Sequence, residues 1–219
     1  PTPTATPTPI SQAPASTPTT PEATPEATPE ATPEATPEAT VRPAIVRVVR
    51  CTTTMVRVDD PNAPLNVRST PNVADGNIVG NLDNGTWVSV EGEEGSWWKI
   101  SDPLSGWVYK DLTESSCNQK VARIQFPANA IAVTFGDRFI GTGTHTYYLE
   151  AFAGQTMTLT ALEGPLPFLR SPSGEELTNA AGMAGDSTWT GQLPESGEYI
   201  LEFPSNYRGY EYEVKVEVR

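Results

Sequence analysis

Aromatic side chains are the groups in this sequence with the clearest capacity for molecular recognition. Trp87, Trp97, Trp98, Trp107 and Tyr109 place five large rings within 23 positions. Consecutive residues of a strand point to opposite faces, so either Trp97 or Trp98 lies at or near the surface. An exposed large ring usually has a binding partner. The pattern predicts that Trp98 and Tyr109 line a shallow groove, and the alternative is that both rings serve packing.

A loop rich in turn residues, 59–64, precedes these aromatic residues and supplies polar groups. We expect Asp60 and Asn62 to add ligand contacts beside Trp98 and Tyr109. Calcium binding by this loop is the alternative, but its spacing matches no recognised ligand loop. The loop therefore favours recognition over metal binding.

Groups that could perform catalysis are scarce. His145 is the only histidine, and no Gly-x-Ser-x-Gly elbow is present to partner it, which favours an ordinary surface or strand histidine. The acidic pairs lie in turns, where solvated charges are expected, whereas a glycosidase needs two carboxyl groups across a cleft. One histidine and two cysteines cannot supply a usual zinc ligand set. We expect no enzyme activity, no catalytic residue, no metal and no cofactor.

The charge balance is strongly acidic, with 14 Lys and Arg against 27 Asp and Glu and a net charge of −13. Such a balance disfavours nucleic acids and anionic membrane surfaces as partners. No apolar run approaches the ~20 residues that span a bilayer. We expect no membrane contact by this fragment itself, and a signal peptide or anchor upstream of Pro1.

Residues 1–40 differ from the remainder in composition. They hold 11 of the 22 prolines and twelve threonines, and five Pro-Glu-Ala-Thr repeats fill 21–40. Burying almost no apolar surface, such a segment stays disordered, and proline biases it toward extended polyproline II geometry. We expect a stalk of up to roughly 120 Å, with threonines suited to O-glycosylation, rather than an arbitrary flexible tail.

The remaining sequence predicts an all-β fold in two units, 41–119 and 120–219. In the first, alternating apolar residues at 45–49 and 55–58 predict strands that feed a small barrel, and Asn84-Gly85 is the strongest hairpin signal. In the second, Tyr210, Tyr212 and three valines alternate with charged residues along the last strand. One buried and one solvated face are typical of antiparallel sheets, so an antiparallel β-sandwich of jelly-roll or immunoglobulin-like type is expected.

Several motifs of the first unit resemble the bacterial SH3 (SH3b) family. They are Leu65-Asn66-Val67-Arg68-Ser69-Thr70-Pro71, then Gly95-Ser96-Trp97-Trp98-Lys99-Ile100, then Gly106-Trp107-Val108. The resemblance covers about 41–117. It implies a small SH3-like barrel that recognises cell-wall or surface peptides.

The second unit resembles the pre-peptidase C-terminal sandwiches and the related g-type lysozyme inhibitors. The motifs are Gly154-Gln155-Thr156-Met157-Thr158-Leu159, Trp189-Thr190-Gly191-Gln192-Leu193-Pro194 and Ser196-Gly197-Glu198-Tyr199-Ile200-Leu201. Family inhibitors carry an arginine cluster in the loop before the last strand. The loop 203–209 of this chain carries Arg208 alone, which departs from the inhibitor pattern.

Cys51 and Cys117, the two cysteines, bracket the SH3-like run. The ends of a small barrel tend to lie close together, so a disulfide across them is expected, the alternative being two separate buried thiols. The Pro/Thr-rich stalk favours an oxidising compartment, which supports the disulfide and an extracellular or cell-surface location.

Together these features favour a secreted or surface-tethered, non-catalytic binding module. Its expected partner is a cell-wall peptide or glycan, or another surface protein. Two alternatives stay open: a structural subunit of an extracellular assembly, with self-association, and an inhibitor of a lytic enzyme such as g-type lysozyme. The acidic surface suits a basic lysozyme by electrostatic steering.

Overall fold

A computed structural model gives the structure of residues 41–178 and 185–219. Strands dominate these ranges, and one turn of 3-10 helix, η1 (Lys110–Leu112), is the only helical element described there. The all-β prediction is confirmed. The predicted stalk, residues 1–40, lies outside the described residues. Within the described ranges no helix has the length and apolar character needed to cross a bilayer.

The barrel consists of seven short strands in one sheet. They are β3 (Met55–Val58), β4 (Leu65–Arg68), β5 (Ile78–Leu82), β6 (Trp87–Glu94), β7 (Trp97–Asp102), β8 (Gly106–Tyr109) and β9 (Thr113–Glu114). The strand order is β5-β4-β8-β7-β6-β3-β9. Alternate residues point inward and form one buried core. Its members are Val56, Val58, Leu65, Val67, Leu82, Val88, Trp98, Ile100 and Val108.

The Asn84-Gly85 signal marks a turn but not a hairpin. Gly85 has a φ of +82°, as such a turn requires. However, β5 pairs only with β4, and β6 pairs with β7 and β3, so the strands that flank this turn are not hydrogen-bonded to each other. The predicted hairpin is wrong because a tight turn reverses the chain without choosing its partner strand. The two-residue hairpin lies at Gly95 and Ser96, where Glu94 opposes Trp97.

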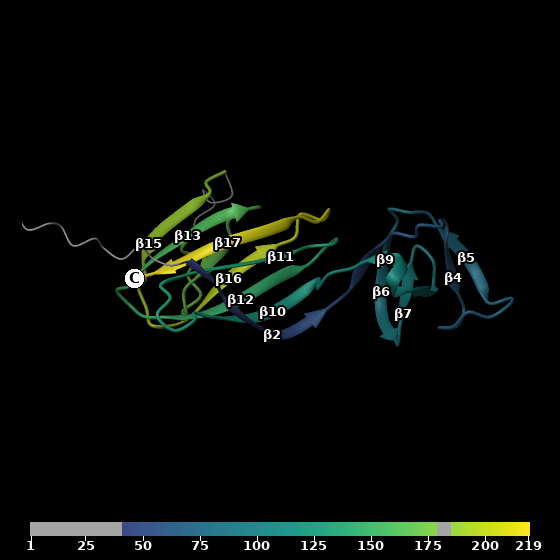
Figure 1. Cartoon of the computed structure of the whole chain (residues 1–219), viewed down its shortest axis with the longest axis horizontal. Coiled ribbons are helices and arrows are strands. Elements are labelled where there is room, and N and C mark those ends of the chain that lie inside the picture. Colours follow the sequence, from purple (N-terminus) through teal and green to yellow (C-terminus); the bar gives the residue numbers. More distant parts are fainter. Residues whose placement is uncertain (1–40, 179–184) are drawn as a thin grey trace, which may run out of the picture. The chain divides into compact units, whose positions relative to one another are not determined.

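The sandwich is made of two five-stranded sheets. The first contains β1 (Val41–Pro43), β11 (Ala132–Arg138), β17 (Glu211–Val218), β13 (Thr156–Glu163) and β15 (Thr188–Gln192), in that order. The second contains β14 (Phe168–Arg170), β16 (Gly197–Pro204), β12 (Thr144–Ala151), β10 (Gln119–Gln125) and β2 (Ile45–Thr52), in that order (Figure 1). Most neighbours are antiparallel, and the pairs β1–β11 and β10–β12 are parallel.

Strand β17 shows the alternation that the sequence predicts. Tyr212, Val214 and Val216 are buried in the sandwich core, whereas Glu211 and Glu213 are exposed. The core is rich in aromatic rings, which bury large apolar areas. Its largest fully buried side chains are Tyr147, Tyr199, Phe139 and Phe203.

The assignment of residues 41–52 to the barrel was wrong. Strand β1 pairs with β11, and β2 pairs antiparallel with β10, so both strands belong to the sandwich. Apolar alternation predicts a strand but does not say which sheet the strand joins. The partner of β2 is β10, which comes after the barrel in the sequence. The predicted disulfide is confirmed: Cys51 and Cys117 are bonded, with Cα atoms 5.2 Å apart, where β2 ends and β10 is about to begin.

Candidate binding groove

A groove on the barrel surface is built around Trp97 and Tyr109. The two residues oppose each other across β7 and β8, and their ring centroids are 5.4 Å apart in an edge-to-face arrangement. Both side chains are half-buried, so each keeps part of its ring accessible. The groove has a volume of about 210 Å³ and is lined by Asp60, Leu65, Asn66, Arg68, Val73, Trp97, Tyr109 and Leu112.

Trp98 occupies the opposite face of β7, contrary to its predicted place in the groove. It lies across from Val108 and is only 9% exposed, within the barrel core. Its indole N–H donates a hydrogen bond to Thr113 Oγ1 at 3.2 Å, and Lys110 Nζ lies 4.4 Å from the ring centroid. The predicted exposure of Trp98 was wrong, because strand alternation specifies opposite faces without saying which ring faces the core.

Asp60 lines the groove from a loop whose backbone is held by hydrogen bonds. Asp60 is 7% exposed. The side-chain amide of Asn84 makes two hydrogen bonds with the main chain of Asp60. The Asp60 N–H donates to Asn84 Oδ1, and Asn84 Nδ2 donates to the Asp60 carbonyl, both at 2.8 Å. The N–H of Asn62 donates to Asp60 Oδ1 at 2.8 Å. Asn62 itself is exposed and does not line the groove, so two of the four predicted residues, Asp60 and Tyr109, meet there.

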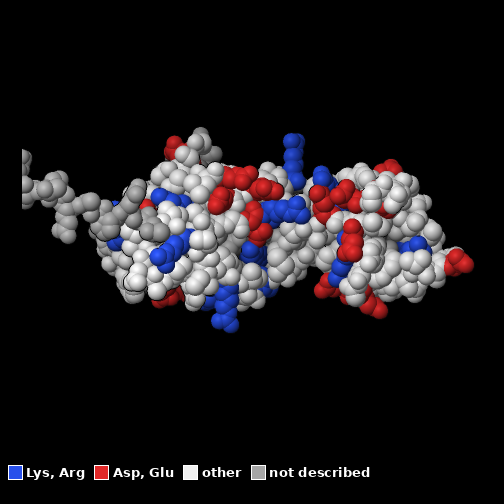
Figure 2. All heavy atoms as spheres, viewed as in Figure 1, with Lys and Arg blue, Asp and Glu red and all other residues white. Residues whose placement is uncertain are grey.

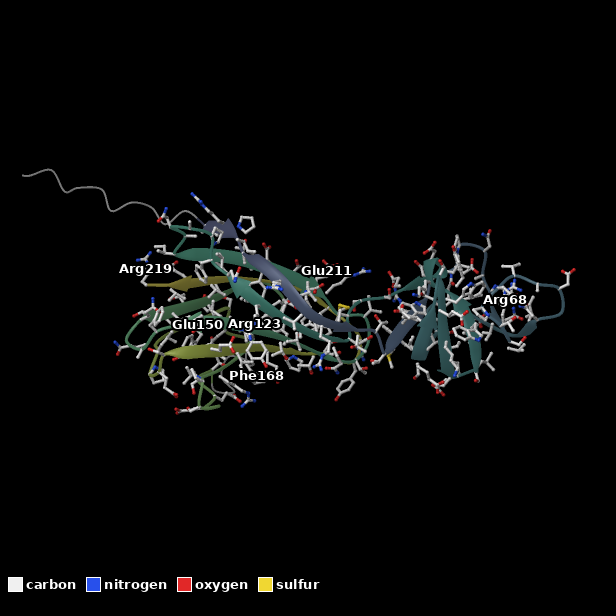
Figure 3. The ribbon with its side chains drawn as sticks, turned by 90° about the horizontal axis from the view of Figure 1, so that it is seen from below. Arg68, Arg123, Glu150, Phe168, Glu211 and Arg219 are labelled. Atoms are coloured by element: carbon white, nitrogen blue, oxygen red, sulfur yellow. A yellow bond between two sulfur atoms is a disulfide. The ribbon has the colours of Figure 1, made fainter. Side chains whose placement is uncertain are left out.

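Arg68 is a groove residue that the sequence analysis missed. It lies on β4, and its Nη1 donates to Asn77 Oδ1 at 2.6 Å (Arg68 is labelled in Figure 3). Asn77 is 8% exposed, and its Nδ2 donates to Thr70 Oγ1 and to the Asn72 carbonyl at 3.0 and 2.9 Å. Among the described residues Arg68 forms no ion pair, so its charge is available to a ligand. The signal was the alternation along β4: Leu65 and Val67 are buried, so Arg68, directly after Val67, points outward.

The groove combines two accessible ring surfaces with a positioned carboxylate and a positioned guanidinium. Rings supply apolar contact area, and the charged groups fix the orientation of a bound molecule. None of its lining residues is a cysteine, serine or histidine that could act as a nucleophile or base. In the described ranges no group of three or more His, Cys, Asp or Glu residues could hold a metal ion. The groove therefore offers apolar contact area together with one acidic and one basic side chain.

The second polar cluster of the chain lies inside the sandwich around His145, which is a strand residue but is fully buried. Its Nε2 is 2.6 Å from the Cys117 carbonyl oxygen, so that nitrogen carries the hydrogen and donates it. Nδ1 then accepts from the hydroxyl of Tyr212 at 2.6 Å. The Tyr212 hydroxyl is 2.7 Å from that of Tyr147, and the ring of Phe139 stacks on the imidazole at 3.8 Å between centroids.

Burial controls the protonation of this cluster. It lowers the pKa of His145, although the Cys117 carbonyl and Asp137 act in the opposite direction. Burial also raises the pKa of Tyr147 and that of Tyr212. Burial lowers the pKa of Lys120. The hydrogen bond to Asp137 and the interactions with Asp137 and Tyr147 outweigh burial, so the pKa of Lys120 is raised. The cluster is a buried network in which the imidazole and both tyrosine hydroxyls are hydrogen-bonded, and it stabilises the interior of the sandwich.

Comparisons with known proteins match a family model to part of the barrel and find solved structures with limited similarity to this chain. Residues 63–114 match the family model of the bacterial SH3 domain. Similar solved structures include the periplasmic inhibitor of g-type lysozyme, PliG, of Aeromonas hydrophila: it is 24% identical with a TM-score of 0.40, covering 47% of this chain and 98% of that one. PliG of Salmonella Typhimurium is 18% identical with a TM-score of 0.36, covering 45% and 97% of the respective chains. No curated protein matches the chain.

Proposed function

We propose that this chain is a non-catalytic binding module that works outside the cytoplasm and holds a cell-wall peptide or another surface polymer in the barrel groove. The observation that carries the proposal is the accessible pair Trp97 and Tyr109 between two charged groups of fixed orientation. The bacterial SH3 match over 63–114 supports a binding role for the same segment. The disulfide supports an oxidising compartment.

The groove favours a short segment of polymer over a small rigid ligand. Its volume of about 210 Å³ lies below the ~300–1,000 Å³ of usual small-molecule pockets, so a ligand would extend beyond it. Asp60 suits an ammonium group and Arg68 a carboxylate. Peptides of a cell wall carry both kinds of group beside small apolar side chains, which is the combination that the groove can bind.

Co-sedimentation with purified peptidoglycan tests the proposal. We expect the full chain to bind, and Trp97→Ala to weaken binding by about tenfold or more, as for a central aromatic contact worth roughly 2 kcal/mol. Trp107→Ala is the matched control, because Trp107 is also half-buried on this sheet but does not line the groove. Equal loss in both variants, or no binding by the folded wild type, would contradict the assignment.

A second candidate, inhibition of a lytic enzyme such as g-type lysozyme, rests on the loop between β16 and β17. Tyr207 is 79% exposed and has a φ of +67°, an uncommon conformation for a residue with a side chain. Ser205 Oγ accepts the N–H of Tyr207 at 2.9 Å, and Asn206 Oδ1 accepts that of Arg208 at 3.0 Å. A hydrogen-bonded loop that presents an exposed tyrosine and arginine has the composition of a protein-binding hot spot.

A lysozyme activity assay separates the two candidates. If the loop is inhibitory, micromolar protein inhibits g-type lysozyme and Tyr207→Ala abolishes inhibition while Trp97→Ala does not. The net charge of −13 predicts that inhibition of a basic lysozyme weakens as salt is added. Full lysozyme activity in the presence of the folded wild type would remove this candidate and leave the groove proposal unaffected.

A further inference from the structure

Strand β2 forms an open edge of the sandwich. It is the last strand of its sheet and pairs only with β10, so its other side has no partner strand among the described residues (Figure 1). All eight of its residues are exposed, and the exposed fractions of Ile45, Val48 and Val49 are 53%, 50% and 60%. Unpaired main-chain groups beside apolar side chains form a template on which another extended segment can add a strand.

The β2 edge is also positively charged in an acidic protein. Arg47 and Arg50 are exposed and form no ion pair in the ranges that the structure covers. No acidic residue occurs between Val41 and Val58. Figure 2 shows blue side chains over the part of the molecule where Figure 1 has β2 and β10.

One pair of arginines is arranged unfavourably. Arg47 lies directly across from Arg123 of β10, which is labelled in Figure 3. Arg123 is neutralised by an ion pair with Glu198, but Arg47 has no such partner within the described residues. Like charges opposed on neighbouring strands repel each other, and only Arg123 of this pair is compensated. A carboxylate on the outer side of β2 would give Arg47 the ion-pair partner that it lacks.

The same features disfavour a second copy of the chain as the partner. Pairing two β2 strands would bring arginines together, and the irregularity between Val121 and Ala122 leaves Val49 unpaired as a bulge. Charges and bulges are devices that protect edges from self-association. We propose that the β2 edge binds an extended segment of another protein in which carboxylate side chains alternate with apolar ones, so that the segment adds a strand along Ile45–Val48.

An apolar groove at the beginning of β2 supports this kind of ligand. Ile45 lines a groove of about 580 Å³ together with Phe126, Ile131 and Phe152. Two of these partners are exposed, Ile131 at 38% and Phe152 at 63%. An apolar side chain near one end of the added strand would enter this groove, while its carboxylates face Arg47 and Arg50.

Titration of the full chain with a fluorescent peptide of alternating glutamate and valine tests the proposal. We expect saturable binding that weakens with salt, and a roughly tenfold loss for Arg47→Glu, because charge reversal turns an attraction into a repulsion. Arg138→Glu is the matched control: it makes the same charge change at an exposed position of β11, outside this edge. Trp97→Ala keeps full binding, which separates this site from the barrel groove.

Three further outcomes would overturn the proposal. A lysine–valine peptide that binds equally well would remove the charge argument. A glutamate–valine peptide with alternate amides N-methylated should not bind, and equal binding by it would indicate charge attraction without strand addition. Self-association of the wild type that Arg47→Glu abolishes would assign the edge to a second copy.

Discussion

At the scale of single residues, Trp97 and Trp98 differ by one position and have opposite environments. Trp97 shares the groove with Tyr109, whereas Trp98 is packed in the barrel core. The register explains the difference, because Trp97 opposes Tyr109 and Trp98 opposes Val108. Side chains alternate between the two faces of a strand. An error of one residue in predicting the inward positions therefore exchanges the buried and exposed faces of the whole strand.

Two asparagines decide how the groove presents its charges. Asn77 holds the guanidinium of Arg68, and Asn84 holds the main chain of Asp60. Asn84 heads an Asn-Gly-Thr sequence that could suggest a glycan acceptor, but its amide nitrogen and oxygen are both engaged with Asp60. Residue type alone did not indicate either role, since each depends on a partner from another segment of the chain.

The buried imidazole of His145 makes a prediction about pH. Burial lowers its pKa below the usual ~6.5, so the unfolded chain binds a proton more readily than the folded one. The free energy of unfolding should therefore be largest above about pH 6.5 and fall as the pH decreases from there toward the lowered value. Urea unfolding followed between about pH 7 and about pH 5 measures this fall.

Two controls isolate the contribution of His145. His145→Gln retains a hydrogen-bond donor and an acceptor but does not titrate, so its stability should vary less over the same pH range. Since the chain has a single histidine, its ring resonances can be followed directly by NMR in the wild type. A ring pKa at or above the usual ~6.5 would contradict the prediction whatever the variant does.

At the scale of elements, the pairing of β2 with β10 makes the barrel an insertion within the sandwich. The chain leaves the second sheet at the end of β2, forms β3 to β9, and returns to the same sheet as β10. The Cys51–Cys117 bond joins the two strands next to this insertion. It therefore holds the edge of the sandwich together at the point where the barrel is connected.

The disulfide should contribute substantially to stability. Its cysteines are 66 positions apart, and closing a loop of that length restricts the unfolded chain by about 4 kcal/mol in the chain-entropy treatment. Replacing both residues, Cys51→Ala with Cys117→Ala, should lower the free energy of unfolding by roughly 2–4 kcal/mol. Urea unfolding of the two proteins measures the difference.

A reducing agent supplies the control for this experiment. It should destabilise the wild type by a similar amount and leave the double variant unchanged, because that variant has no cysteine to reduce. An unchanged wild type after complete reduction would show that the bond adds no stability.

At the scale of the whole molecule, the net charge of −13 is distributed unevenly. Acidic and basic side chains are mixed over the face shown in Figure 2, without the broad basic surface that a phosphate backbone requires. The arginines of β2 interrupt the acidic background locally. This contrast favours oriented protein partners, which electrostatic attraction would guide to one edge.

The sequence by itself determined the secondary-structure class and the position of the segment that matches the bacterial SH3 family model. These depend on local information, namely strand alternation, turn glycines and motif order, which the chain carries residue by residue. The alternation along β17 and the bond between Cys51 and Cys117 were also predictable. The binding roles predicted for Asp60 and Tyr109 stay predictions, although both residues line the groove around Trp97.

Tertiary structure decided which strands pair, which tryptophan faces outward, and where β2 belongs. An alternating apolar strand satisfies any sheet with a buried face, so its partner is chosen by contacts between segments distant in the sequence. The same holds for Arg68 and for the cluster around His145, whose partners come from other strands and loops. Long-range pairing sets register, and register sets which side chains meet.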